Sequence, residues 1–298
     1  MLDLPSLARL AERHAEDLDC QVAAFDLGGY RFDGNARPEL MGVINLSSGS
    51  WYRESVVPDG PAAVKRGRVL AAQGAAILDV GAESSLAHTE RVGAGEQESL
   101  LLPVVRELAG EGSIVSVETY HLSVAAAVLE AGAKVLNLTG SVQTEAIYRE
   151  AAAHEAGVII CYVAGPNVRE VGDLELGRDP IAALYDYFAE QVDLATAAGV
   201  ERLWIDPGLG FYYRNLEDSA ERVRHQTRVF LESFRLRRLG WPVCQALPHA
   251  FATFQDEVRS AEAFFAVAAR LGRVDLLRTH EVPRVRAVLD TLAQIRAE

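Results

Sequence analysis

Short apolar runs alternate with longer amphipathic stretches along most of the chain, beginning at Met41. The runs are rich in Val, Ile and Leu, and the stretches between them repeat apolar residues at helical spacing. This alternation predicts βα units and therefore a parallel sheet. The eight expected strands are Met41 to Asn45, Ala76 to Gly81, Ile114 to Glu118, Val135 to Asn137, Val158 to Val163, Arg202 to Asp206, Pro242 to Ala246 and Leu276 to His280.

A helix is expected after each strand, and glycines at several of the expected helix ends favour these boundaries. Eight strands with eight helices predict a TIM (β/α)8 barrel, an α/β fold whose sheet closes on itself. A doubly wound open sheet is the alternative. The expected helices are Pro61 to Gln73, Glu96 to Leu108, His121 to Glu130, Thr144 to Glu155, Pro180 to Ala198, Leu216 to Leu239, Glu257 to Leu271 and Val282 to Arg296.

The N-terminal residues do not follow this alternation of strands and helices. An amphipathic pattern predicts a helix at Leu4 to Leu18, and Gly28 to Phe32 suits a short hairpin or a lid over the bottom of the barrel. We therefore expect an N-terminal extension over residues 1–38, to which we assign no chemistry, and one barrel domain over residues 39–298.

One expected strand ends abruptly in Asp206-Pro207-Gly208-Leu209-Gly210. Pro207 disfavours helical geometry at Asp206, and the two glycines permit turns and the close approach of a ligand. An acid fixed at the carboxyl end of a strand stands where α/β folds carry their active sites. The motif alone also fits a simple turn.

Polar residues stand at the ends of other expected strands as well, and in a barrel all these ends meet at one mouth. Each residue alone would be explained by capping of the next helix. Together, their carboxylates and amides suit a flat heterocycle with ring N–H and NH₂ groups. Arg278 and His280 are two residues apart and share a face, so with Asn45 they suit a phosphate or diphosphate. The strand-end set is Asn45, Glu83, Glu118, Asn137, Asp206, Arg278 and His280.

The chain carries 42 Asp and Glu against 29 Lys and Arg, a formal net charge of −13. This acidity argues against nucleic acid and anionic membranes as partners, because both need clustered positive potential. Three widely spaced cysteines predict no disulfide framework, and the N-terminus lacks the pattern of a signal peptide. We expect a soluble, cytoplasmic protein. Six arginines between Arg222 and Arg238 predict a solvated helix face or a dimer contact, and we expect a homodimer.

Six motifs occur in order: Met41 to Asn45, Ile77 to Ser84, Val115 to Tyr120, Leu136 to Gly140, Asp206 to Phe211 and Arg278 to Val282. In this order they resemble the motifs of dihydropteroate synthase, in the superfamily of pterin-binding TIM barrels. That family joins 6-hydroxymethyl-7,8-dihydropterin diphosphate to p-aminobenzoate in folate biosynthesis, with Mg²⁺ and loss of diphosphate. The resemblance covers about residues 40–298.

The resemblance implies roles for single residues. The implied pterin-binding set is Glu118, Asn137 and Asp206, with Glu118 at the position of a family Asp. The implied diphosphate-binding set is Asn45, Arg278 and His280, with Mg²⁺ at Asn45. The implied catalytic set is His249, Arg278 and His280.

Three residues of the family pattern are missing here. Gly49 stands in the loop after the first expected strand, called the first loop, where the family has Asp. Leu86 stands in the loop after the second expected strand, called the second loop, where the family has Arg, and His249 stands after the seventh strand where it has Lys. In the family these residues close over the pterin and contact p-aminobenzoate. Histidine is shorter than lysine and only partly charged near neutral pH. We therefore expect a preserved pterin floor and an altered second-substrate side.

The resemblance predicts a transferase that condenses the pterin diphosphate with p-aminobenzoate or another nucleophile. The altered loops leave an alternative open, a pterin-binding paralogue without this activity. Such a paralogue would be either a non-catalytic binding protein or a methyltransferase that uses a reduced folate. Arg278 and His280 disfavour methyl transfer, because that reaction needs no anion site.

Overall fold

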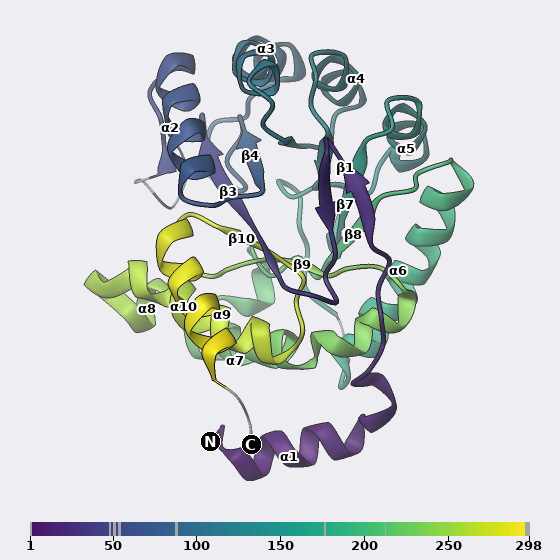
Figure 1. Cartoon of the computed structure of the whole chain (residues 1–298), viewed down its shortest axis with the longest axis vertical. Helices are drawn as coiled ribbons and strands as arrows, with labels where there is room; N and C mark the ends of the chain where they lie inside the picture. Colours follow the sequence, from purple (N-terminus) through teal and green to yellow (C-terminus); the bar gives the residue numbers. More distant parts are fainter. Residues whose placement is uncertain are drawn as a thin grey trace.

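The computed structural model describes residues 2–47, 49, 52, 55–86, 89–175, 177–211 and 213–295. Eight strands form one parallel sheet in the order β8-β7-β6-β5-β4-β3-β10-β9. Figure 1 shows strands of this sheet at the centre of the molecule with helices around them. A parallel bridge between Ile205 and Val243 joins its two outer strands. This arrangement is the predicted TIM barrel and excludes the open-sheet alternative. The strands are β3 (Glu39–Asn45), β4 (Ile77–Gly81), β5 (Val115–Thr119), β6 (Val135–Leu138), β7 (Gly157–Cys161), β8 (Leu203–Asp206), β9 (Cys244–Ala246) and β10 (Leu276–Thr279).

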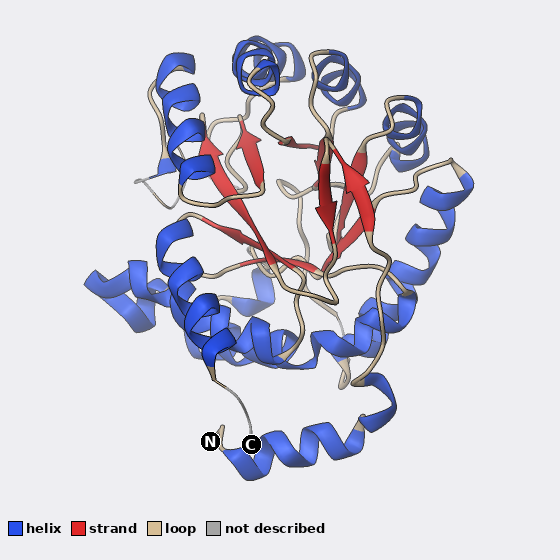
Figure 2. Cartoon of the chain, in the orientation of Figure 1, coloured by secondary structure: helices blue, strands red, loops and turns tan. Residues whose placement is uncertain are grey.

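Helices surround the strands, as Figure 2 shows. They pack through apolar faces such as that of α4, which buries Val124, Val128 and Leu129. Aspartate side chains cap several helix starts, and Asp59 accepts from the Ala62 N–H at 2.8 Å. Within the described ranges, no helix is long and apolar enough to cross a membrane. The barrel helices are α2 (Gly60–Ala72), α3 (Ala94–Gly110), α4 (Leu122–Glu130), α5 (Thr144–Ala153), α6 (Pro180–Ala197), α7 (Ser219–Glu232), α9 (Ala261–Leu271) and α10 (Val282–Gln294).

A hairpin plugs the amino-terminal end of the barrel. Strands β1 (Phe25–Leu27) and β2 (Tyr30–Phe32) pair antiparallel, as expected for this segment. Trp204, at the second position of β8, lies edge-on to the rings of Phe25 and Phe32 at centroid distances of 4.8 and 5.3 Å. The three rings form part of a buried cluster at this end of the barrel. The hairpin therefore covers this end of the barrel.

The N-terminal helix α1 (Leu4–Arg13) is shorter than predicted, and a 3₁₀ helix, η1 (Ala15–Asp17), follows it. The segment after it is tied to the barrel by Arg237, which is 1% exposed. Its guanidinium donates to the Cys20 carbonyl at 3.2 Å and to Asn35 Oδ1 at 2.7 Å, and pairs with Asp275. The expectation of a solvated arginine face is therefore wrong for Arg237.

Two predicted helices are broken in the structure. The segment expected as one helix from Leu216 to Leu239 contains α7 and η4 (Ser233–Leu239), and a further 3₁₀ helix, η3 (Arg214–Leu216), ends at its first residue. Ser233 Oγ donates to the Val229 carbonyl at 2.6 Å where α7 gives way to η4, and such local bonds compete with helix geometry. The helix expected from Glu257 begins only at Ala261, after α8 (Phe251–Phe254) and η5 (Gln255–Ser260). Gln255 has φ +47°, which ends α8.

We expect Trp204→Ala to lower the free energy of unfolding by about 3–5 kcal/mol, because it removes a large ring from a packed cluster. Chemical denaturation followed by circular dichroism measures the change. The control is Phe264→Ala, since Phe264 is 47% exposed and its loss should cost far less. Equal effects of the two substitutions would contradict a structural role for the plug.

Candidate active site

A cavity of about 300 Å³ opens at the carboxyl-terminal ends of the barrel strands. Glu83, singled out at the end of β4, also lines it. Of the three residues that depart from the family pattern, His249 lines the cavity, whereas Leu86 is buried away from it. The structure thus brings together all seven residues to which the sequence assigned a site role: Asn45, Glu118, Asn137, Asp206, His249, Arg278 and His280.

The strand register explains this convergence. Asn45 and Glu118 both pair with Gly81, from its two sides, and Glu118 also pairs with Asn137 on β6. Asp206 ends β8, two strands beyond Asn137. Neighbouring parallel strands therefore hold these side chains at a similar level of the barrel.

Asp79, in the middle of β4, is the centre of the buried polar network. It is fully buried and accepts hydrogen bonds from Ser116 Oγ at 2.7 Å, Asn137 Nδ2 at 3.2 Å and Arg278 Nε at 2.7 Å. The strand-end set predicted from the sequence does not include Asp79, because this residue lies within its strand. An acid inside an apolar strand was the available signal, because a buried charge requires partners.

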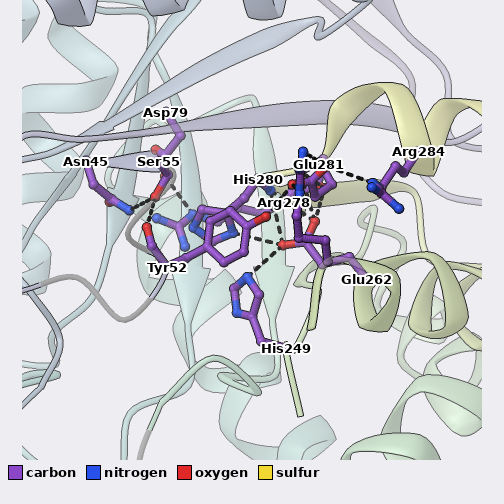
Figure 3. A network of polar contacts seen from close by, with 12 residues as sticks. Asn45, Tyr52, Ser55, Asp79, His249, Glu262, Arg278, His280, Glu281 and Arg284 are labelled. Carbon is purple, nitrogen blue, oxygen red and sulfur yellow. Dashed lines mark hydrogen bonds and ion pairs between the residues drawn. The ribbon is translucent and has the colours of Figure 1, made fainter. Parts of the chain in front are cut away.

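Arg278 lies between two carboxylates, as Figure 3 shows for its position beside Asp79. Its Nε donates to Asp79 Oδ2 at 2.7 Å and its Nη2 to Glu118 Oε2 at 2.6 Å. Burial opposes the charge, but the two carboxylates more than compensate and raise the pKa of Arg278 above its ordinary value. An anion bound here would share the guanidinium with Asp79 and Glu118.

The two acids of the implied pterin-binding set titrate close to neutral pH. Burial raises the pKa of Glu118 to about 7, with Arg278 opposing the rise. Burial likewise raises the pKa of Asp206 to about 6, and the hydrogen bond from Gly208 opposes it. Both groups can therefore change charge over a physiological range of pH.

The turn after Asp206 has a clear structural cause. The N–H of Gly208 donates to Asp206 Oδ1 at 2.8 Å, which fixes the carboxylate against the start of the loop. Gly208 has φ +74°, and a Cβ there would lie 2.2 Å from the Tyr162 carbonyl oxygen. Only glycine fits this position, so the motif both turns the chain and orients the acid.

Asn45 connects the barrel to the first loop. Its Nδ2 donates to Ser55 Oγ at 2.6 Å, and Ser55 Oγ donates to the Tyr52 carbonyl at 2.8 Å. The Val57 N–H donates to the Asn45 carbonyl at 2.9 Å. Asn45 therefore positions the loop as well as facing the cavity.

The second loop is fastened by an arginine from another part of the chain. Arg169, in the β7–α6 connection, is 5% exposed. Its Nη1 donates to the Ser84 carbonyl and Thr89 Oγ1, each at 2.7 Å, and also to the Leu86 carbonyl. Its Nη2 donates to the Thr89 carbonyl at 2.7 Å. No pattern around Arg169 in the sequence pointed to this role.

The first and second loops also contact each other. Ser84 Oγ donates to the Gly49 carbonyl at 3.0 Å. A Cβ at Gly49 would lie 2.7 Å from Thr89 Cγ2. The absence of a side chain at Gly49 therefore permits the close approach of the two loops.

The two site histidines converge on Glu262 of α9, which the sequence analysis missed (Figure 3). His280 Nδ1 lies 2.9 Å and His249 Nε2 3.1 Å from Glu262 Oε1. Burial by itself raises the pKa of Glu262, but its contacts with the two histidines lower it below its ordinary value. Burial lowers the pKa of His280, with Glu262 opposing. The Tyr52 ring stacks on His249 at 4.5 Å.

Comparisons with known proteins agree with this geometry. Residues 41–280 match the family model described as pterin binding enzyme. A dihydropteroate synthase of Mycobacterium leprae (strain TN) is 30% identical over 269 residues, covering 87% of this chain and 93% of that protein. One from Synechocystis is 27% identical over 267 residues, covering 86% and 89%. A crystal structure of dihydropteroate synthase from Thermus thermophilus in complex with 6HMPPP has a TM-score of 0.71 and 26% identity, covering 92% of this chain and 100% of that chain.

The barrel with its polar mouth, and the match over most of its length, define an enzyme of the pterin-binding class. The chain belongs to the dihydropteroate synthase family within that class, as a divergent member. The resemblance identified from the six motifs is thereby confirmed. The prediction of a dihydropteroate synthase-like transferase is confirmed as well.

We expect Asp79→Ala to lower the free energy of unfolding by about 3–5 kcal/mol, because it leaves the buried Arg278 without one of its two carboxylates. Urea unfolding at pH 7 measures the loss. Ser116→Ala is the matched control, since it removes a single hydrogen bond to Asp79 and should cost about 1 kcal/mol. Indistinguishable losses would show that Asp79 is not the centre of the network.

Proposed function

We propose that this chain condenses 6-hydroxymethyl-7,8-dihydropterin diphosphate with p-aminobenzoate or another nucleophile and releases diphosphate. The observation that carries the proposal is the set of Glu118, Asn137 and Asp206 around one cavity. Two carboxyl groups and an amide complement the ring N–H and NH₂ groups of a pterin edge. The relative whose structure is titled a complex with 6HMPPP supports this class of ligand.

The diphosphate would lie toward Asn45, Arg278 and His280, which line the same cavity. Arg278 would contribute positive charge, although it also pairs with Asp79 and Glu118. The Nδ1 of His280 faces the Glu262 carboxylate, so His280 would donate to a diphosphate oxygen through Nε2 in its protonated form. Asn45, Ser47 and Glu83 offer oxygen ligands beside them, and such a set fits Mg²⁺, which also binds substrate phosphates. When bound at Asn45, Mg²⁺ would neutralise charge on the leaving diphosphate.

The reaction breaks the bond between the pterin methylene carbon and the diphosphate oxygen. The amine nitrogen of the nucleophile then bonds to that carbon and loses a proton. His249 and His280 line the cavity, where they would orient the departing anion and the incoming amine. Positioning contributes strongly to such a rate, because the reacting atoms must be held close together.

We also propose that the protein is a cytoplasmic homodimer. The three free cysteines suit a reducing compartment. The alternative of a paralogue without synthase activity is not favoured, because the relatives described above carry the name dihydropteroate synthase.

We expect the dissociation constant for a neutral pterin to rise as the pH falls from 8 to 5. The pKa values of Glu118 and Asp206 are about 7 and about 6, so both groups gain protons across this range and lose capacity to accept from ring N–H groups. Isothermal titration calorimetry measures the profile. Asp206→Ala should weaken binding at pH 8 by about 1–3 kcal/mol and flatten the profile.

Asp193→Ala, on the exposed side of α6, is the control for that measurement and should leave the profile unchanged. Pterin binding by Asp206→Ala that equals binding by the parent would remove Asp206 from the ring site.

We expect diphosphate release with p-aminobenzoate to be about a hundredfold slower than in the Mycobacterium leprae relative. His249 stands where the family pattern has lysine, so the site lacks one fixed positive charge. An activation barrier that is about 2.7 kcal/mol higher as a result corresponds to a hundredfold lower rate. His249→Lys should recover at least about tenfold. Gly49→Asp should recover nothing, because its Cβ would press on Thr89. A steady-state diphosphate assay compares the variants, and a parent rate equal to that of the relative would contradict the altered second-substrate side.

A further inference from the structure

We infer that His249, Glu262 and His280 form a binding site for one transition-metal ion of the zinc type. These residues form a group whose potential ligand atoms all lie within 4.8 Å of one another. The site differs from the Mg²⁺ position proposed at Asn45, and it does not depend on the proposed condensation.

The distances suit a shared ion. His280 Nδ1 and His249 Nε2 lie 2.9 and 3.1 Å from the same oxygen, Glu262 Oε1. Nitrogen and oxygen ligands sit about 2.0–2.2 Å from Zn²⁺, so neighbouring ligands of one ion are roughly 3–3.5 Å apart. The two contacts to Glu262 are thus close to the spacing of ligands around one ion, and the three ligand atoms lie within 4.8 Å of one another. Binding would require the imidazole rings to move until all three atoms reach the distance of a bound ion.

His249 carries a second sign of a ligand. Its Nε2 is buried, and among the described residues this atom has no partner in hydrogen-bond geometry, although Glu262 Oε1 is only 3.1 Å away. A buried ring nitrogen without a hydrogen bond is costly. A metal ion would satisfy it together with the carboxylate oxygen.

Supporting contacts hold the three ligands in place. Glu262 Oε2 accepts from the backbone N–H groups of His280 and Glu281, each at 3.1 Å, and from Thr279 Oγ1. Tyr52 stacks on the His249 ring with an interplanar angle of 18°. Such contacts commonly fix the orientation of metal ligands.

The ligand set selects the ion. Imidazole favours zinc, copper, iron and nickel, whereas Mg²⁺ prefers oxygen ligands. Three protein ligands leave at least one coordination position open, and His249 and His280 both line the cavity. The open position would therefore take water or an oxygen of a cavity ligand. A lysine in place of His249, as in the family pattern, would put a positive charge where the ion binds.

Titration of the metal-stripped full chain with Co²⁺, a coloured substitute for Zn²⁺, tests the inference. We expect one equivalent to bind with visible absorption bands of a low-coordinate ion, and Zn²⁺ but not millimolar Mg²⁺ to displace it. His249→Lys should weaken Co²⁺ binding by more than the 10–100-fold that changes in supporting residues cause. The control, His154→Lys at the end of α5, should bind Co²⁺ as the parent does.

Unchanged Co²⁺ binding by His249→Lys, or loss of the bound ion to Mg²⁺, would overturn the inference. Circular dichroism shows whether His249→Lys folds. If His249→Lys does not fold, crystals of the unmodified chain soaked in Zn²⁺ provide the test, because anomalous diffraction locates the ion. An ion between His249, Glu262 and His280 supports the site, and zinc found only elsewhere overturns it.

Discussion

The buried guanidinium of Arg278 sets the arrangement of the barrel mouth. A charge at this depth is tolerated only with compensating partners, and Asp79 and Glu118 supply them from β4 and β5. Asp79 in turn orients Asn137, whose Nδ2 donates to the same Asp79 oxygen, Oδ2, that pairs with Arg278. The placement of Glu118 and Asn137 at the cavity therefore follows from the need to neutralise one cation inside the sheet.

Two groups of cavity residues are held in place in different ways. Glu118, Asn137 and Asp206 are called the floor, and His249 and His280 are called the rim. The floor is held by strand register and ion pairs, whereas the rim depends on Glu262, a helix residue that gathers both histidines. A histidine at position 249 suits this environment, because both imidazoles contact the Glu262 carboxylate. A lysine there would form an ion pair with the same carboxylate. Because different elements hold the floor and the rim, a substitution in one part need not disturb the other.

Sequence patterns predicted the barrel and the convergence of its strand ends, because hydrophobic periodicity and strand polarity are local properties. They did not predict a role for Asp79, because this acid lies inside an apolar strand and not at its end. Glu262 had a signal, since Phe265 and Ala266 place it on the buried face of α9 by helical spacing. Arg169 and Tyr52 lie in irregular segments, where partners distant in sequence decide the conformation. The breaks in the helices near Ser233 and Gln255 likewise depend on local backbone bonds that periodicity does not encode.

The fastening of the second loop by Arg169 has a consequence for ligand exchange. Because one side chain from the β7–α6 connection holds several carbonyls of the β4–α3 connection, these two segments cannot open separately without leaving a buried guanidinium unsatisfied. Entry and release at this side of the barrel would therefore proceed as a single concerted displacement. The residence time of a ligand would then depend on the strength of the Arg169 contacts, although the ligand does not take part in them.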